Sequence, residues 1–191
     1  MNYTLKNIVI NAMGIALFVV LSLCLQVPVF QNYYLCIGYV AMTVFSYNVG
    51  VRSGTIVGTF GVVIYCVIIN GMRGMPGWAI GNLVIGIIIG LTFKFTKRLK
   101  KPILEIIISS FIAIISTAIA ILIVKSFVEY SLYLEPFLVR VASNMYAFIA
   151  DAFVIIISIP IAQRLNPILS KYLKVKDIKS NNTCLKGEKY V

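Results

Sequence analysis

The sequence of residues 70–95 reads NGMRGMPGWAIGNLVIGIIIGLTFKF. A glycine-rich start with one arginine leads into an apolar run about as long as the 20 residues that cross a bilayer. Pro76 suits the first turn of a helix, where its missing N–H group is not needed. Trp78 follows at the depth where tryptophans commonly anchor a membrane helix at the interface. The stretch therefore predicts a loop followed by a transmembrane helix.

The rest of the chain has the same character, and we predict an all-α integral membrane protein. Of the 191 residues, 60% are hydrophobic and 12% are charged, whereas a soluble domain carries roughly 25% charged residues. Backbone polar groups in lipid must pair internally, and the apolar runs lack the alternation of barrel strands, so we expect helices. The six predicted spans lie near residues 8–27, 33–49, 54–71, 77–95, 103–125 and 137–161. They form a compact bundle within a transmembrane domain over residues 1–170, followed by a basic tail over 171–191.

Glycines recur at every fourth position in the third and fourth predicted spans. Gly50, Gly54 and Gly58 form one series, and Gly77 and Gly81 followed by Gly86 and Gly90 form the other. Small residues at this spacing allow two helix backbones to approach closely. We therefore predict that these two helices pack tightly against each other.

The positive charges predict the orientation of the bundle. The chain carries 17 lysines and arginines and has a formal net charge of +11. An even number of spans puts both termini on one side, and all basic residues except Arg73, Lys125 and Arg140 then fall on that side. Basic residues are enriched in cytoplasmic loops. We predict that both termini are cytoplasmic in a bacterial cell membrane, and that the basic clusters flank spans and do not bind nucleic acid.

Several kinds of chemistry are poorly supported by the sequence. The chain has no histidine, which is the commonest metal ligand and general base. Its 4 cysteines form no CxxC pair, and it contains no GxxxxGK[ST] loop for ATP phosphates. We therefore predict no metal, no cofactor and no catalytic residues.

The last predicted span carries a stripe of polar residues. Arg140, Asn144, Asp151 and Ser158 are spaced so that they fall on one side of a helix. A charged residue at bilayer depth costs at least about 2.5 kcal/mol and usually faces a partner or a water-filled cavity. We expect Arg140 and Asn144 to line a pocket that opens outward, although Arg140 could instead anchor the interface. The role of Asp151 stays open between a structural hydrogen bond and a function.

Segments on the predicted outer side supply the other candidate residues. Aromatic side chains near the second and sixth spans would form walls, and the loop before the fourth span would close the pocket. The full set of predicted substrate-binding residues is Tyr33, Tyr34, Asn70, Arg73, Trp78, Asn82, Tyr130, Tyr133, Arg140 and Asn144. Apolar walls with a few polar groups suit a small water-soluble molecule. The basic residues favour an anionic ligand, and Glu129 and Glu135 partly offset them.

Two motifs give the chain a resemblance to a known family. The first span contains NAMGIA, with Ala12 and Ala16 in an AxxxA step, and the fourth opens with GMPGWAIGNLVIG. With six short spans and a length of 191 residues, the chain resembles a substrate-binding S component of an energy-coupling factor (ECF) vitamin transporter from residue 6 to about residue 170.

The resemblance implies partners and a mechanism. Ala12 and Ala16 would face the coupling helices of a membrane scaffold subunit, which carries two cytosolic ATPases. The ligand would lie in the outer half under loops at about 28–33, 71–77 and 126–136. The subunit would capture a vitamin outside and topple in the membrane to release it inside.

The identity of the vitamin stays open at the level of sequence. Pantothenate, which bears a carboxylate, fits Arg73 and Arg140 best. Riboflavin, hydroxymethylpyrimidine and pyridoxine are alternatives, because asparagines and tyrosines could bind any of them. The competing class is a membrane protein outside transport, such as a lipid-modifying enzyme or an assembly factor. Copurification of a scaffold and two ATPases would distinguish the classes.

Overall fold

The computed structural model describes residues 3–25, 27–30, 33–69, 71–99 and 101–173. The helices are α1 (Tyr3–Cys24), α2 (Gly38–Asn48), α3 (Val51–Ile68), α4 (Met75–Thr96), α5 (Pro102–Ala118), the π-helix η1 (Ile119–Lys125), α6 (Ser126–Tyr133) and α7 (Phe137–Leu173). An antiparallel hairpin of β1 (Val27–Phe30) and β2 (Tyr33–Leu35) connects α1 to α2. The tail from residue 174 onward, which makes up most of the predicted segment 171–191, lies outside the described residues.

The described helices include 5 that are long and apolar enough to cross a membrane. These candidate spans are Asn7–Cys24, Val51–Ile68, Met75–Thr96, Pro102–Tyr133 and Phe137–Leu169. They correspond to the first, third, fourth, fifth and sixth predicted spans. The chain is thus a multi-pass, mainly helical membrane protein.

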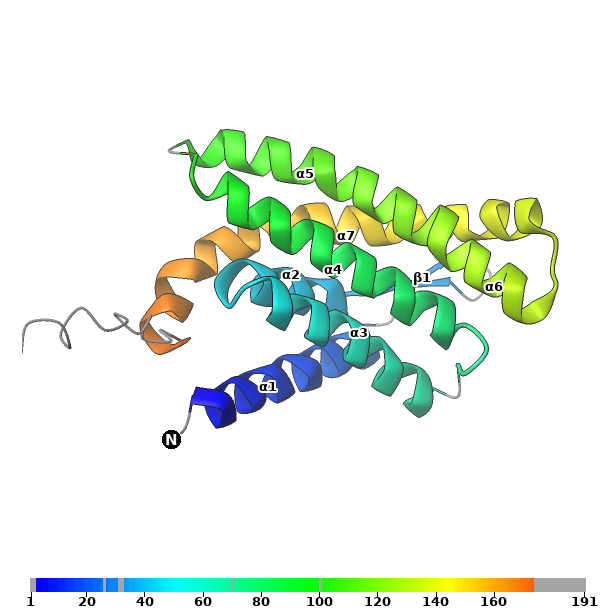
Figure 1. Cartoon of the computed structure of the whole chain (residues 1–191), viewed down its shortest axis with the longest axis horizontal. Coiled ribbons are helices and arrows are strands. Elements are labelled where there is room, and N and C mark those ends of the chain that lie inside the picture. The colour runs from blue at the N-terminus through cyan, green and yellow to red at the C-terminus, as the bar shows by residue number, and fades with distance from the viewer. Residues whose placement is uncertain (1–2, 26, 31–32, 70, 100, 174–191) are drawn as a thin grey trace, which may run out of the picture.

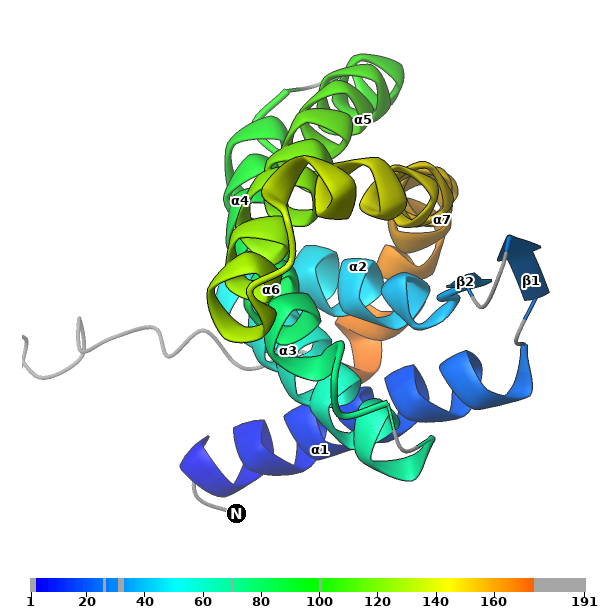
Figure 2. The ribbon, with the colours of Figure 1, turned by 90° about the vertical axis from the view of Figure 1, so that its right-hand side faces the viewer.

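The predicted second span, 33–49, is not among these five. Its first part forms strand β2, and α2 has only 11 residues, which give a length of roughly 16 Å against a hydrocarbon core of about 30 Å. Most residues of α2 are buried, and Figure 2 shows the helix in the middle of the bundle. A helix that is apolar on all sides is either buried or a membrane span, so composition alone could not tell the two apart.

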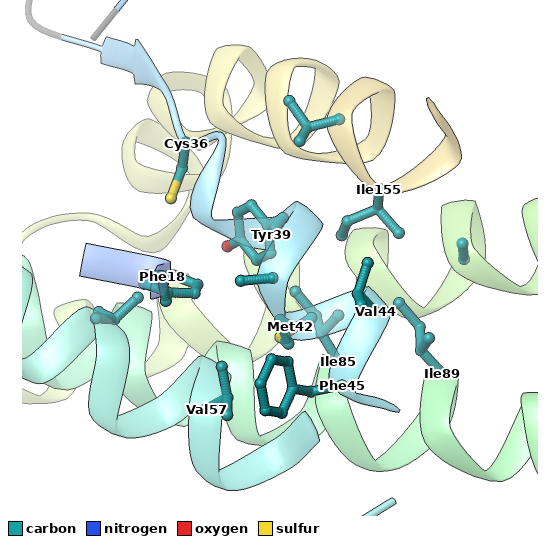
Figure 3. Close-up of a cluster of buried hydrophobic side chains, with 14 of the residues drawn as sticks. Phe18, Cys36, Tyr39, Met42, Val44, Phe45, Val57, Ile85, Ile89 and Ile155 are labelled. Atoms are coloured by element: carbon teal, nitrogen blue, oxygen red, sulfur yellow. The ribbon is translucent and has the colours of Figure 1, made fainter. Parts of the chain in front are cut away.

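The side chains of α2 form the centre of the core. Tyr39 and Met42 are fully buried, and Phe45 is almost so. Figure 3 shows them between Phe18 of α1 and Val57 of α3 on one side and residues of α4 and α7 on the other. The short helix therefore holds the longer helices together.

The predicted loop 126–136 is mostly helical. Helices α5, η1 and α6 form one run from residue 102 to residue 133, so only residues 134–136 separate it from α7. Leu134 ends α6 in the left-handed conformation with φ 55°, and its N–H donates to the Tyr130 carbonyl at 2.9 Å. The predicted sixth span is also longer than expected, because α7 continues to Leu173.

The tight packing of α3 against α4 is confirmed, but only glycines of α4 lie at the contact, since Gly54 and Gly58 of α3 face Ser46 and Met42 of α2. A Cβ atom built on Gly86 would lie 2.8 Å from the Cα atom of Thr55, and one built on Gly90 would lie 2.8 Å from the Cα atom of Val51. Contacts this short between backbones leave no room for a methyl group, so glycine at these positions sets the distance between the helices.

Figure 1 shows that α1 begins and α7 ends at the same end of the bundle. The β-hairpin, the connection between α3 and α4, and α6 lie at the opposite end. The three segments expected to cover a ligand therefore meet at one end.

The side of the membrane on which this end lies is testable by labelling. We expect a cysteine at Ser131, an exposed position of α6, to react with a membrane-impermeant thiol reagent in intact cells. Cys184 in the tail should react only after the cells are opened. Cys24 is exposed, so a Cys24→Ser background is the matched control. The opposite labelling pattern would show that the termini face outward.

Candidate functional site

A cavity of about 300 Å³ lies among α3, α4, η1 and α7, toward the end that carries the hairpin and α6. We call it the apolar cavity. Its lining residues are Leu35, Cys36, Tyr65, Cys66, Ile69, Gly71, Gly74, Trp78, Ile121, Lys125, Ala147 and Asp151. Most of them are aliphatic, aromatic or sulfur-containing, as in typical small-molecule sites.

Two aromatic residues form one wall of the apolar cavity. The rings of Tyr65 and Trp78 meet edge to face, with centroids 5.8 Å apart and planes 88° apart. The Trp78 indole N–H donates to the Tyr39 hydroxyl at 2.9 Å. The indole ring is thus fixed from behind, and its flat surface suits contact with a planar ligand.

Two ionisable side chains also reach the apolar cavity. Lys125 is the last residue of η1, and Asp151 belongs to α7. The Lys125 Nζ atom lies 3.9 Å from Glu129 Oε1, and Asp151 Oδ2 lies 3.1 Å from the Tyr39 hydroxyl oxygen. Single π-helical turns inside α-helices are frequent at functional sites, and here the π-helix ends at the residue that brings a cation to the cavity.

A second cavity, of about 220 Å³, adjoins the first. We call it the polar cavity. It is lined by Arg73, Gly74, Lys125, Glu129, Tyr133, Arg140 and Asn144. Because Gly74 and Lys125 line both cavities, the two lie side by side, one mainly apolar and the other polar.

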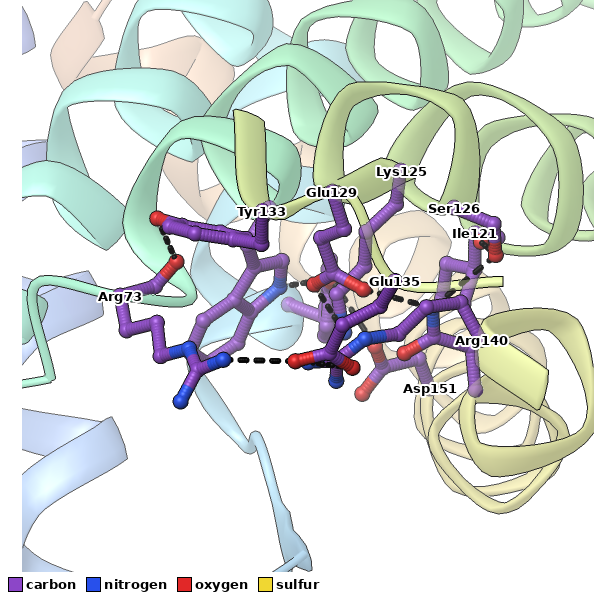
Figure 4. A network of polar contacts seen from close by, with 12 residues as sticks. Arg73, Ile121, Lys125, Ser126, Glu129, Tyr133, Glu135, Arg140 and Asp151 are labelled. Atoms are coloured by element: carbon purple, nitrogen blue, oxygen red, sulfur yellow. Dashed lines mark hydrogen bonds and ion pairs between the residues drawn. The ribbon is translucent and has the colours of Figure 1, made fainter. Parts of the chain in front are cut away.

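Glu135 forms ion pairs with two arginines that line the polar cavity. Its Oε1 atom lies 2.6 Å from Arg73 Nη2, and its Oε2 atom lies 2.5 Å from Arg140 Nη2 (Figure 4). The Tyr133 hydroxyl donates to the Arg73 carbonyl, and the Arg73 guanidinium carbon lies 5.2 Å from the Tyr133 ring centroid. These contacts fix the connection between α3 and α4 to the connection between α6 and α7.

The structure brings together five of the predicted site residues. Arg73, Tyr133, Arg140 and Asn144 line the polar cavity, and Trp78 lines the apolar cavity. The amide nitrogen of Asn144 donates to Ser126 Oγ at 3.0 Å and to Glu129 Oε2 at 3.1 Å. These contacts orient the Asn144 side chain inside the cavity.

Two other predicted residues lie away from both cavities. Asn82 is fully buried behind the wall of the apolar cavity, where its amide contacts the Tyr39 hydroxyl and the Gly58 carbonyl. Tyr130 is 45% exposed on α6 and lines neither cavity. Ser158, at the end of the predicted stripe, donates to the Ile155 carbonyl at 2.6 Å and serves the helix itself.

The remaining predicted residues are only partly described. Tyr33 and Tyr34 belong to β2, and the structure gives their backbone alone. Asn70 lies outside the described residues.

Sequence reasoning missed Tyr65, Cys36, Cys66 and Lys125 as residues of the site. Lys125 had a usable signal, because a lysine within an apolar run is expected to face a partner or a cavity. The two cysteines and Tyr65 had none, since each is an apolar residue within an apolar segment.

The two alanines expected to contact a scaffold subunit are exposed. Ala12 and Ala16 lie on the outer face of α1 beside Met13, which is 66% exposed, and Leu17. Figure 1 shows α1 at the edge of the bundle. This face of α1 is therefore accessible to another membrane protein.

Comparison with known proteins identifies the family. A family model described as "ECF-type riboflavin transporter, S component" matches residues 2–167. Nothing among the curated proteins or the solved structures matches the chain. The matched region covers every candidate membrane span in full, except that it ends two residues before the end of the span in α7. It agrees with the resemblance carried by the AxxxA step. The chain belongs to the family of S components of ECF-type riboflavin transporters.

Proposed function

We propose that this protein is the substrate-binding subunit for uptake of riboflavin. The observation that carries the proposal is the pair of adjacent cavities, one walled by Trp78 and Tyr65 and the other lined by polar side chains. Riboflavin has a planar three-ring system and a flexible chain of hydroxyl groups. The ring would occupy the apolar cavity, and the hydroxylated chain would reach the polar cavity past Lys125.

The two cavities fit riboflavin better than they fit pantothenate. Pantothenate has no ring to contact Trp78. Its carboxylate would have to compete with Glu135, which already binds both Arg73 and Arg140. The two arginines on which the pantothenate prediction depended therefore support it less than their positive charge suggested.

The remaining parts of the proposal concern partners and orientation. Uptake would be driven by a complex of a membrane scaffold subunit and two cytosolic ATPases, since the sequence contains no phosphate-binding loop. The protein would lie in a bacterial cell membrane with both termini in the cytoplasm. The exposed face of α1 with Ala12 and Ala16 would contact the scaffold.

Ligand binding to the purified protein tests the proposal. We expect riboflavin to bind at least about 100-fold more tightly than pantothenate, because burying a flat ring of this size against an aromatic wall contributes several kcal/mol. Riboflavin fluorescence should be quenched on binding, and calorimetry should give the affinity of the non-fluorescent pantothenate. Lumichrome, which has the ring without the hydroxylated chain, is the control for the polar cavity and should bind with intermediate affinity.

The alternative outcomes are distinct. Tighter binding of pantothenate than of riboflavin would reject the proposed substrate. Mass spectrometry of small molecules released from the denatured protein would then identify the ligand that the site prefers.

A further inference from the structure

Four polar side chains meet at the wall of the apolar cavity. Tyr39 of α2 contacts Trp78 and Asn82 of α4 and Asp151 of α7. Tyr39 and Asn82 are completely buried, and Asp151 is 5% exposed. In a group this deeply buried, hydrogen bonds among the side chains have to be matched donor to acceptor.

The positions of three hydrogens in this group follow from its chemistry. The Trp78 indole nitrogen can only donate, so the Tyr39 hydroxyl oxygen accepts at 2.9 Å. The Gly58 carbonyl can only accept, so the amide nitrogen of Asn82 faces it at 3.1 Å and the amide oxygen faces Tyr39. That oxygen lies 2.7 Å from the Tyr39 hydroxyl and takes its single hydrogen.

The contact between Tyr39 and Asp151 then lacks a hydrogen unless the aspartate supplies it. Asp151 Oδ2 lies 3.1 Å from the Tyr39 hydroxyl oxygen, which has already used its hydrogen but still has a lone pair. A carboxylate placed there would set two lone pairs against each other. We propose that Asp151 is a protonated carboxylic acid, which donates from one oxygen to Tyr39 and offers its other oxygen to the cavity as an uncharged acceptor.

The surroundings of Asp151 offer a carboxylate little compensation for its burial. Lys125 of η1 lines the same cavity, and its Nζ atom lies 3.9 Å from Glu129 Oε1, which offsets its positive charge. Cys36, before α2, and Tyr65 and Cys66 of α3 line the same cavity and bring no positive charge to it. A buried carboxylate without a close, hydrogen-bonded counter-charge is unfavourable, whereas the acid form is not.

The protonation state determines which ligands Asp151 can select. This step rests on the proposed function. An uncharged acid offers a carbonyl acceptor to an N–H donor, such as the imide N–H on the riboflavin ring, and gives no advantage to a cation. A carboxylate at the same position would favour a cationic ligand instead. Asp151 would thus be a specificity-determining residue for a neutral ring that bears an N–H group.

The protonation state can be observed without any ligand. Asp151 and Asp177 are the aspartates of the chain, so protein labelled with carbon-13 at the aspartate carboxyl group gives a simple NMR spectrum. Asp177→Asn is the matched control, because it leaves Asp151 as the labelled residue. At pH 7 we expect the Asp177→Asn protein to show the carbon-13 chemical shift of a protonated carboxyl group. This signal should be lost when Asp151→Asn is added. The shift of a carboxylate in the Asp177→Asn protein would overturn the proposal.

Substitutions at Asp151 test its role in selectivity. Asparagine keeps one donor and one acceptor, so Asp151→Asn should bind riboflavin within about threefold of the original protein, whereas Asp151→Ala should lose about tenfold or more. Equal losses in the two variants would show that the charge is required and would overturn the proposal. If the Asp177→Asn protein shows the acid but does not bind riboflavin, the proposed substrate fails and the protonation state stands.

Discussion

Replacing Trp78 with alanine is expected to weaken riboflavin binding by roughly two orders of magnitude. The indole ring forms the flat wall of the apolar cavity and is fixed by Tyr65 at 5.8 Å and by the hydrogen bond to Tyr39. Loss of an aromatic contact of roughly 100 Å² at about 25–30 cal/mol per Å² removes about 3 kcal/mol, which corresponds to roughly 150-fold in affinity. A titration of riboflavin fluorescence with purified protein measures the change.

Two matched variants separate the contributions of the Trp78 ring and its N–H group. Trp78→Phe keeps an aromatic surface and removes the donor to Tyr39, so it should lose about tenfold or less. Tyr130→Ala on α6 removes an aromatic residue that lines neither cavity and should leave the affinity unchanged. Wild-type affinity in Trp78→Ala would place the ligand outside the apolar cavity.

The long helices could be predicted from sequence because each is an apolar run of sufficient length. The segment 33–49, which is not confirmed as a span, is also apolar, but its helix α2 lies within the protein core. Most residues of α2 are buried, and Met42 contacts α3 so closely that a Cβ atom on Gly58 would lie 2.3 Å from its sulfur. Hydropathy measures transfer out of water and does not distinguish lipid from a protein core.

The candidate site was predictable where polar residues interrupt apolar helices. Arg140 and Asn144 stood out in this way, and both line the polar cavity. The neutralisation of Arg140 could not be predicted, because Glu135 also binds Arg73 from a connection distant in sequence. A net charge counted along the sequence therefore could not show that one carboxylate already occupies a nitrogen of each arginine.

The proposed docking face of α1, with Ala12 and Ala16, leads to the second prediction of a large effect. Changing Ala12 and Ala16 together to tryptophan should abolish riboflavin uptake by cells and leave riboflavin affinity nearly unchanged. The opposite face of α1 holds it to the bundle: Phe18 is fully buried, and a Cβ atom on Gly14 would lie 2.5 Å from Val57 Cγ2. Ala12 and Ala16 point away from these contacts, so the added rings would not disturb the cavity.

The expected loss arises at the contact with the scaffold subunit. Small residues four apart allow two helices to approach closely, and two bulky rings in a tight interface cost about 1–3 kcal/mol each, which weakens association roughly 30-fold or more. Copurification of the scaffold and ATPase subunits with the variant, together with uptake of labelled riboflavin, measures both effects. The matched control is Ile103→Trp with Ile107→Trp, which adds two rings to the exposed face of α5.

The control and the binding measurement together decide what the α1 face does. Figure 2 shows α1 and α5 on opposite sides of the bundle, so a scaffold that docks on α1 should tolerate the α5 rings. Loss of uptake with the α5 variant and normal uptake with the α1 variant would move the docking surface to α5. A fall in riboflavin affinity in the α1 variant would instead mean that α1 supports the cavity, since residues on its inner face already pack against α2 and α3. Uptake lost with affinity retained assigns Ala12 and Ala16 to coupling, because only the step after ligand capture would then have changed.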